Sequence, residues 1–413
     1  MWMIVISLII PSLISGPLVP DFIVSLSALI FLVYVIKKKA YYYFNNKPLI
    51  IFFIFCIYCI LVSIFVAKDT LLSLESSLFY FRFGVFACLI WYLIDKNKKI
   101  LNYFYYTLVI CFSILVLDGY IQYFVGFNII GIPASGPRIS SFFGQELIMG
   151  SYLSRLFPLF FALFVLRKKS KSELYWFGIL FTLVDVLIYI TGERSSFFFL
   201  NISTIFIIIF ITKYQKFRLF VFLFSIVLIT ILTLSYSKLA ERMIFETVRG
   251  IGFLKESQNK NIFTIEHDSL IKTAYNMFLD KPILGHGPKM FRVICQNEKY
   301  AVGVSPCMTH PHNFYVQLLA ETGIVGFSFL FITFAYVLYC SYRQFKSIIF
   351  KQKRYLTDYQ VCLLSGILIT VWPLTTNGNF FNNWLAIVYS LPFGFYLHSI
   401  YGKNKKNISL NSL

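Results

Sequence analysis

The sequence predicts an all-α polytopic membrane protein with about twelve transmembrane helices and one large outer loop. Two observations lead to this fold class. Of the 413 residues, 58% are hydrophobic and only 13% are charged, whereas soluble domains carry about 25% charged residues. Apolar runs also recur along the whole chain, and about 20 apolar residues suffice for a helix to cross a bilayer.

The expected spans follow one another in chain order with mostly short connections. They cover residues 2–15, 20–36, 48–66, 72–94, 101–117, 146–166, 174–190, 197–212, 217–236, 323–340, 358–374 and 384–400. Each is an apolar run bounded by polar or basic residues. The first run lacks a basic start and a clear small-residue cleavage site, so it is interpreted as a span rather than a signal peptide.

Basic residues mark alternate connections and predict the orientation. More than half of the 37 Lys and Arg lie in six connections, at residues 37–47, 96–99, 167–171, 213–218, 343–354 and 403–406. The positive-inside rule assigns these connections to the cytoplasm. Both termini are expected there as well. The net charge of +19 is therefore attributed to topology, and nucleic-acid binding is not predicted.

One connection, residues 237–311, is long and lies on the outer side. The chain is accordingly divided into a first transmembrane region of about nine helices (1–236), the loop with the motif discussed below (237–322), and a last region of about three helices with a cytoplasmic tail (323–413). Long loops are usually functional, and this one carries ten Lys and Arg, which favours an anionic ligand. Leu270, Ala274 and Met277 recur at helical spacing before Pro282, which predicts a helix on the membrane face.

Two of the eight cysteines stand apart from the rest. Six lie in or at the edge of apolar spans, where small packing residues are expected. Cys295 and Cys307 lie in the outer loop. An outer compartment is oxidising, so a disulfide between these two is predicted.

Four arginines are expected near the outer leaflet. Arg82 and Arg155 lie within spans, Arg138 lies in the outer segment before Arg155, and Arg194 lies at the turn "TGERSSF". Arg82 and Arg155 can be structural partners of Glu75, Asp118, Glu146 or Asp185. Alternatively, the guanidinium groups bind a phosphate-bearing lipid, since they match phosphate oxygens bidentately.

Four of the five histidines lie in or beside the outer loop: His267, His286, His310 and His312. Such clustering favours a function over isolated structural roles. The spacing matches no common metal motif, so no metal site is predicted. A general base, or a phosphate contact from an imidazolium, is the preferred interpretation.

The segment "HPHNFYVQLLAETGIVGF" resembles the signature of the O-antigen ligase/polymerase family, with His312, Glu321, Gly323 and Gly326 at the matching positions. The upstream stretch "KTAYNMFLDKPILGHGPKMF" is similar to the family's segment ahead of the histidine, and "TGERSSF" is similar to its arginine-serine turn, which carries Arg194. The layout of many spans with one large periplasmic loop before the motif also fits.

The resemblance implies a glycosyltransferase of the C-type architecture. Its donor is a glycan linked to a polyprenyl diphosphate such as undecaprenyl diphosphate, and it needs no metal or other cofactor. His312 is then the candidate base or phosphate ligand, and Arg194 a diphosphate ligand. Glu321 either orients the histidine or pins the helix start. The family's second arginine is missing at its usual place, where His267 stands, which leaves His267, Arg249, Arg82 and Arg155 as alternatives. His286, His310 and Arg138 are further substrate-binding candidates.

The resemblance leaves several reactions open. An O-antigen ligase transfers glycan to the lipid A core in lipopolysaccharide biosynthesis, a polymerase transfers it to another lipid-linked glycan, and a protein O-oligosaccharyltransferase transfers it to protein. A transporter of polysaccharide or lipid is the alternative from another class. The expected location is the bacterial inner membrane, with the site facing the periplasm. A chain-length regulator protein is a further candidate partner.

Overall fold

The computed structural model describes residues 2–250 and 263–403 and is helical in these ranges, apart from isolated bridges at Phe127–Pro133 and Ser135–Arg138. The helices in chain order are α1 (Trp2–Ser7), α2 (Ile9–Ser12), α3 (Leu18–Lys38), η1 (Tyr41–Tyr43), α4 (Lys47–Phe65), α5 (Thr70–Ser77), α6 (Arg82–Lys96), α7 (Lys99–Val125), η2 (Ser141–Phe143), α8 (Met149–Val165), α9 (Lys171–Ile190), α10 (Arg194–Phe210), α11 (Gln215–Ser235), α12 (Ser237–Ala240), η3 (Glu241–Phe245), α13 (Glu246–Gly250), α14 (Ile265–Asp280), α15 (Phe291–Ile294), α16 (Phe314–Ile349), α17 (Asp358–Thr370) and α18 (Asn383–Tyr401).

Seven helical segments in the described ranges are long and apolar enough to cross a membrane: α3, α4, α5 with α6, α7, α9, α11 and α16. Every expected span coincides with helix, so the helical prediction is confirmed, whereas the number twelve is not established. Much of the difference is helix length, because α8, α10 and α17 have only 17, 17 and 13 residues. At about 1.5 Å per residue they are shorter than a hydrocarbon core of about 30 Å.

Helix α8 lies in the interior of the bundle. Nearly all of its side chains are buried, including those on both sides of Pro158, as expected for a helix that is apolar on every face. Helices α10, α17 and α18 pack around it. Arg155 lies in the second turn of this enclosed helix, so its guanidinium must find partners in the protein or in a ligand.

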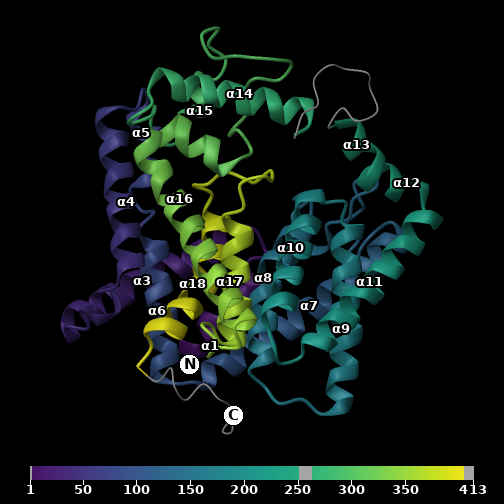
Figure 1. Ribbon diagram of the computed structural model, residues 1–413. Coiled ribbons are helices and arrows are strands. Elements are labelled where there is room, and N and C mark those ends of the chain that lie inside the picture. The colour runs from purple at the N-terminus through teal and green to yellow at the C-terminus, as the bar shows by residue number, and fades with distance from the viewer. Residues whose placement is uncertain (1, 251–262, 404–413) are drawn as a thin grey trace.

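Helices α14 and α15 lie across one end of the bundle, over the first turns of α16, as Figure 1 shows. Helix α14 confirms the one predicted from apolar spacing, and Leu270, Ala274 and Met277 are buried. These three form a small core of their own with residues that include Phe291 and Ala320. The placement of α14 on a membrane face stays a prediction.

The two halves of the family-like motif meet at a break in α16. Gly323 has φ 61° and ψ −167° inside the helix, a region that residues with a Cβ rarely adopt. The helix break leaves backbone groups open, and residues 282–287 bind them: Ile324 donates to the Pro282 carbonyl (2.9 Å), and Gly287 N–H donates to the Glu321 carbonyl (2.7 Å). The packing is tight, because a Cβ on Gly323 would lie 2.1 Å from the Ile283 oxygen.

One buried ion pair involves Asp185, a carboxylate that was among the expected partners of Arg82 and Arg155. Asp185 of α9 binds Arg218 of α11 at 2.7 and 3.0 Å, and Thr204 of α10 accepts a third hydrogen bond from Arg218 at 2.6 Å. The pair is fully enclosed, so removing either partner would leave an uncompensated charge. Asp185 is therefore not the partner of Arg82 or Arg155.

Candidate functional site

A cationic pocket of about 330 Å³ lies where α8, α10, α14 and the start of α16 approach the loop between α17 and α18. It is lined by Arg138, Ile148, Ser151, Arg155, Gly192, Glu193, Arg194, Ser195, Ser196, Phe199, Arg242, His267, His312, Thr376, Asn377 and Gly378. Four arginines face one carboxylate in this lining. The structure thus brings together five of the predicted site residues: Arg138, Arg155, Arg194, His267 and His312.

Arg155 is the deepest cation of the pocket, with 5% of its surface exposed. Its Nε donates to Ser151 Oγ at 3.0 Å and one Nη to Asn377 Oδ1 at 3.1 Å. The other Nη is buried and has no hydrogen-bond partner in the described part of the chain. The guanidinium lies over the rings of Phe199 and Tyr389 at 4.6 and 5.3 Å. No carboxylate of the described residues lies within ion-pair distance, so this cation can still accept an anionic ligand.

The remaining arginines surround the turn before α10. Arg242 Nε donates to the Gly192 carbonyl at 3.3 Å, and its Nη1 binds Glu246 at 2.5 Å. Arg138 donates to the Leu147 carbonyl at 3.0 Å, and Arg194 to Thr247 Oγ1 at 3.3 Å. Burial is the largest cause of the lowered pKa of Arg138. Glu193 opposes it, and Arg242 and Arg194 add smaller lowering effects. Cations held this close repel one another, and a bound anion relieves that repulsion.

Glu193 is the only carboxylate that the described residues contribute to the pocket lining, and its oxygens are engaged. It accepts hydrogen bonds from the backbone N–H groups of Gly150 and Ser151 at 2.6 and 2.9 Å, and from Ser196 Oγ at 2.8 Å. A carboxylate at a helix N-terminus is favoured by the helix dipole. Burial nevertheless raises the pKa of Glu193 to about 6, because it outweighs these hydrogen bonds. The residue joins α8 to α10 and keeps the pocket closed on this side.

Three imidazoles meet at the pocket entrance. The ring centre of His312 lies 4.0 Å from that of His310 and 5.2 Å from that of His267. Burial, and to a smaller extent His267, lower the pKa of His312. Burial, followed by His312 and Arg292, lowers the pKa of His310 to about 3. Neutral rings can accept protons, so His312 is suited to act as a base near neutral pH.

His312 also has an unusual backbone. Its φ is 56°, in the left-handed region that costs a residue with a side chain about 1–2 kcal/mol. Asn377 N–H donates to its carbonyl at 2.8 Å, and the next residue, Asn313, caps α16 by accepting from the N–H groups of Tyr315 and Val316. Backbone strain of this kind is concentrated at functional sites.

Glu321 does not line the pocket but links α15 to α16. Its carboxylate is buried and accepts from Phe291 N–H at 3.2 Å and from Gln317 Nε2 at 3.0 Å. Gln317 in turn donates to Asn379 Oδ1 at 2.8 Å and accepts from Phe380 N–H at 2.9 Å. Of the two roles expected for Glu321, this geometry favours the structural one.

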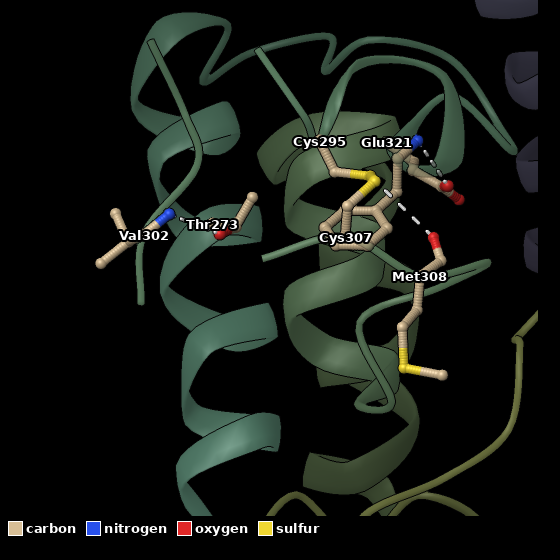
Figure 2. The surroundings of a disulfide bond; sticks show 7 residues. Thr273, Cys295, Val302, Cys307, Met308 and Glu321 are labelled. Atoms are coloured by element: carbon tan, nitrogen blue, oxygen red, sulfur yellow. Dashed lines mark hydrogen bonds between the residues drawn. A yellow bond between two sulfur atoms is a disulfide. The ribbon is translucent and has the colours of Figure 1, made fainter. Parts of the chain in front are cut away.

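The predicted disulfide between Cys295 and Cys307 is present, and Figure 2 shows it beside α14 and the Glu321 carboxylate. It closes the segment that precedes His310. The same segment is held to α14 where Val302 N–H donates to Thr273 Oγ1 at 3.1 Å. The histidines are therefore attached to a covalently closed support rather than a free loop.

The other predicted site residues lie outside the pocket lining. Arg82 pairs with Asp21 at 2.7 Å, an acid that was not among its expected partners. Arg249 pairs with Glu241 at 2.6 Å on the surface. His286 is buried against α14, where its ring nitrogen lies 3.0 Å from the Met277 carbonyl. His310 contacts His312 without lining the pocket itself.

Two charged residues of the pocket lining, Arg242 and Glu193, were not among the predicted site residues. Arg242 lies in the long connection, which was already noted for its basic residues, so its charge was a usable signal. Glu193 adjoins Arg194 in "TGERSSF" and was passed over, because nothing in the sequence placed α8 beside it. The amides of the loop between α17 and α18 bind protein groups: Asn379 binds Gln317, Asn382 caps α18, and Asn383 binds Asp21.

Comparison with known proteins gives a family match for part of the chain. Residues 177–331 match the family model described as Wzy_C, O-Antigen ligase. The matched range runs from α9 through the break in α16 and includes Arg194, Arg242, His267 and His312. Arg138, Arg155 and the loop after α17 lie outside it. No curated protein matches the chain.

Proposed function

Because the match over residues 177–331 supports membership of the O-antigen ligase family, we propose that this protein transfers a glycan from a polyprenyl-diphosphate carrier to an acceptor hydroxyl at the periplasmic face of the inner membrane. The acceptor is the lipid A core in a ligase or a second lipid-linked glycan in a polymerase. The observation that carries the proposal is the pocket of about 330 Å³, which is lined by four guanidinium groups together with His312 and His267.

The proposed reaction divides the pocket into two sides. A ring nitrogen of His312 takes the proton of the acceptor hydroxyl, whose oxygen then bonds to the anomeric carbon of the donor sugar. The bond from that carbon to the diphosphate oxygen breaks, and the carrier diphosphate leaves with the electron pair. Arg155, Arg194 and Arg242 stabilise the leaving charge, which is the kind of contact whose loss costs about 3–4 kcal/mol of barrier.

The test is deletion of the gene in its native host, followed by gel analysis of lipopolysaccharide. Cores carrying a single repeat indicate a polymerase, and bare cores with polymer left on the carrier indicate a ligase. Complementation with wild type should restore the profile, and Arg194→Gln should not. The matched control is Arg249→Gln, which removes an arginine that is exposed and already paired. An unchanged profile after deletion contradicts a role in lipopolysaccharide, and glycoproteins and then transport would be assayed.

The pH dependence of transfer is expected to show an acid limb below pH 6.5, the ordinary pKa of histidine. The neutral ring of His312 is the active form, and its pKa is lowered by burial and by His267. The rate therefore holds until the pH falls through that lowered pKa, and is lost below it. The measurement is kcat/KM from about pH 4.5 to 8, since this quantity reports the free enzyme. A rate that rises on acidification would instead indicate that an imidazolium binds phosphate.

A further inference from the structure

The loop between α17 and α18 contacts both Arg155 and His312, which have different roles in the proposed reaction. Within it, Asn377 has 5% of its surface exposed. Its side-chain Oδ1 accepts a hydrogen bond from Arg155 at 3.1 Å, and its backbone N–H donates to the His312 carbonyl at 2.8 Å. One residue thereby joins the deepest cation of the pocket to the backbone of His312, whose imidazole also lines the pocket.

The rest of the loop is held firmly on either side of Asn377. Ser195 Oγ of α10 lies 2.6 Å from Thr376 Oγ1. Asn313 Nδ2 donates to the Pro373 carbonyl at 2.8 Å. Beyond Asn377, Gln317 accepts from Phe380 N–H and is tied to Glu321. A group fixed by several bonds to rigid helices can position its neighbours, whereas a free loop cannot.

Both ends of the Asn377 amide bind protein groups. Oδ1 is occupied by Arg155, and Nδ2 donates to the Thr375 carbonyl at 3.4 Å. Arg155, in contrast, keeps one Nη without a partner in the described residues while the other Nη is held by Asn377. The direction of the open N–H groups is thus set by the bond to Asn377.

We infer that Asn377 is a positioning residue, which fixes His312 relative to Arg155 so that the acceptor hydroxyl and the carrier diphosphate are aligned across the anomeric carbon. The inference rests on the proposed function and deepens it. Alignment of this kind is sensitive, because a displacement of about 1 Å can reduce a rate by about 100-fold.

Two substitutions separate positioning from ligand binding. Asn377→Ala removes the side-chain bond to Arg155, keeps the backbone bond to His312 and leaves the charge of Arg155. Transfer should therefore fall about 10- to 100-fold while affinity for the diphosphate changes less than about threefold. Asn377→Asp, of the same size, sets a carboxylate against Arg155, so affinity for the diphosphate should fall by about tenfold or more. Asn383→Ala is the matched control, since this exposed amide in the same region binds only Asp21.

The full-length variants are purified in detergent. Binding is measured with undecaprenyl diphosphate, and transfer with the lipid-linked glycan extracted from the deletion strain. The contrast between loss of rate in Asn377→Ala and loss of affinity in Asn377→Asp supports the inference. Wild-type values in Asn377→Ala overturn it, as does a loss of rate that follows a drop in thermal stability shared with Asn383→Ala. Failure of the wild-type protein to bind undecaprenyl diphosphate contradicts the proposed function itself.

Discussion

Replacing His312 with alanine is expected to lower the rate of glycan transfer by about 10²- to 10⁴-fold, the range that a positioned general base contributes. The expectation follows from the place of this ring at the pocket entrance, beside His267 and His310. Affinity for undecaprenyl diphosphate should change little, because the neutral imidazole acts on the acceptor hydroxyl. The measurement is transfer by purified protein, with binding determined on the same samples.

His312→Gln should behave like the alanine variant, since glutamine is polar but cannot take a proton. His398→Gln is the control. His398 is another of the five histidines of the chain, and it lies in the last turn of α18. If His312→Ala lost diphosphate affinity in proportion to its rate, the ring would be a phosphate ligand. If it retained the full rate, the catalytic role of His312 would be wrong even for a true member of the family.

Replacing Gly323 with alanine is expected to prevent stable folding, at a cost above about 4 kcal/mol, which places it among the exceptional single substitutions. The backbone at this position is in a region that costs a residue with a side chain about 1–3 kcal/mol. The added Cβ would also lie 2.1 Å from the Ile283 oxygen. That carbonyl cannot move freely, because the neighbouring Pro282 carbonyl binds Ile324 N–H at 2.9 Å.

The measurement is the yield of monodisperse protein in detergent and its thermal midpoint. Gly178→Ala is the matched control, since a Cβ there meets its nearest atom, in the Phe217 ring, at an ordinary 3.5 Å. If the Gly323→Ala protein had the yield and midpoint of the Gly178→Ala protein, close contact between residues 282–287 and α16 would not be required for folding.

Local chemistry explains which predictions the structure confirms. The apolar spacing of Leu270, Ala274 and Met277 indicated α14, because apolar residues recur every three to four positions on the buried face of a helix. The structure itself shows where glycines are needed, since a Cβ on Gly323 or Gly285 would meet backbone atoms of the opposite segment. The cysteine pair was likewise readable from its spacing and its loop.

The sequence by itself therefore determined the helical membrane class, the helix α14, the disulfide and the types of side chain available for chemistry. Only the tertiary structure decided which cations share a pocket. Arg138, Arg155, Arg194 and Arg242 come from four separate segments, while Arg82, of equal promise in the sequence, is neutralised by Asp21. The physical reason is that hydrophobic periodicity reports burial along one helix, whereas pairing of charges depends on which helices pack together, and no local pattern records that.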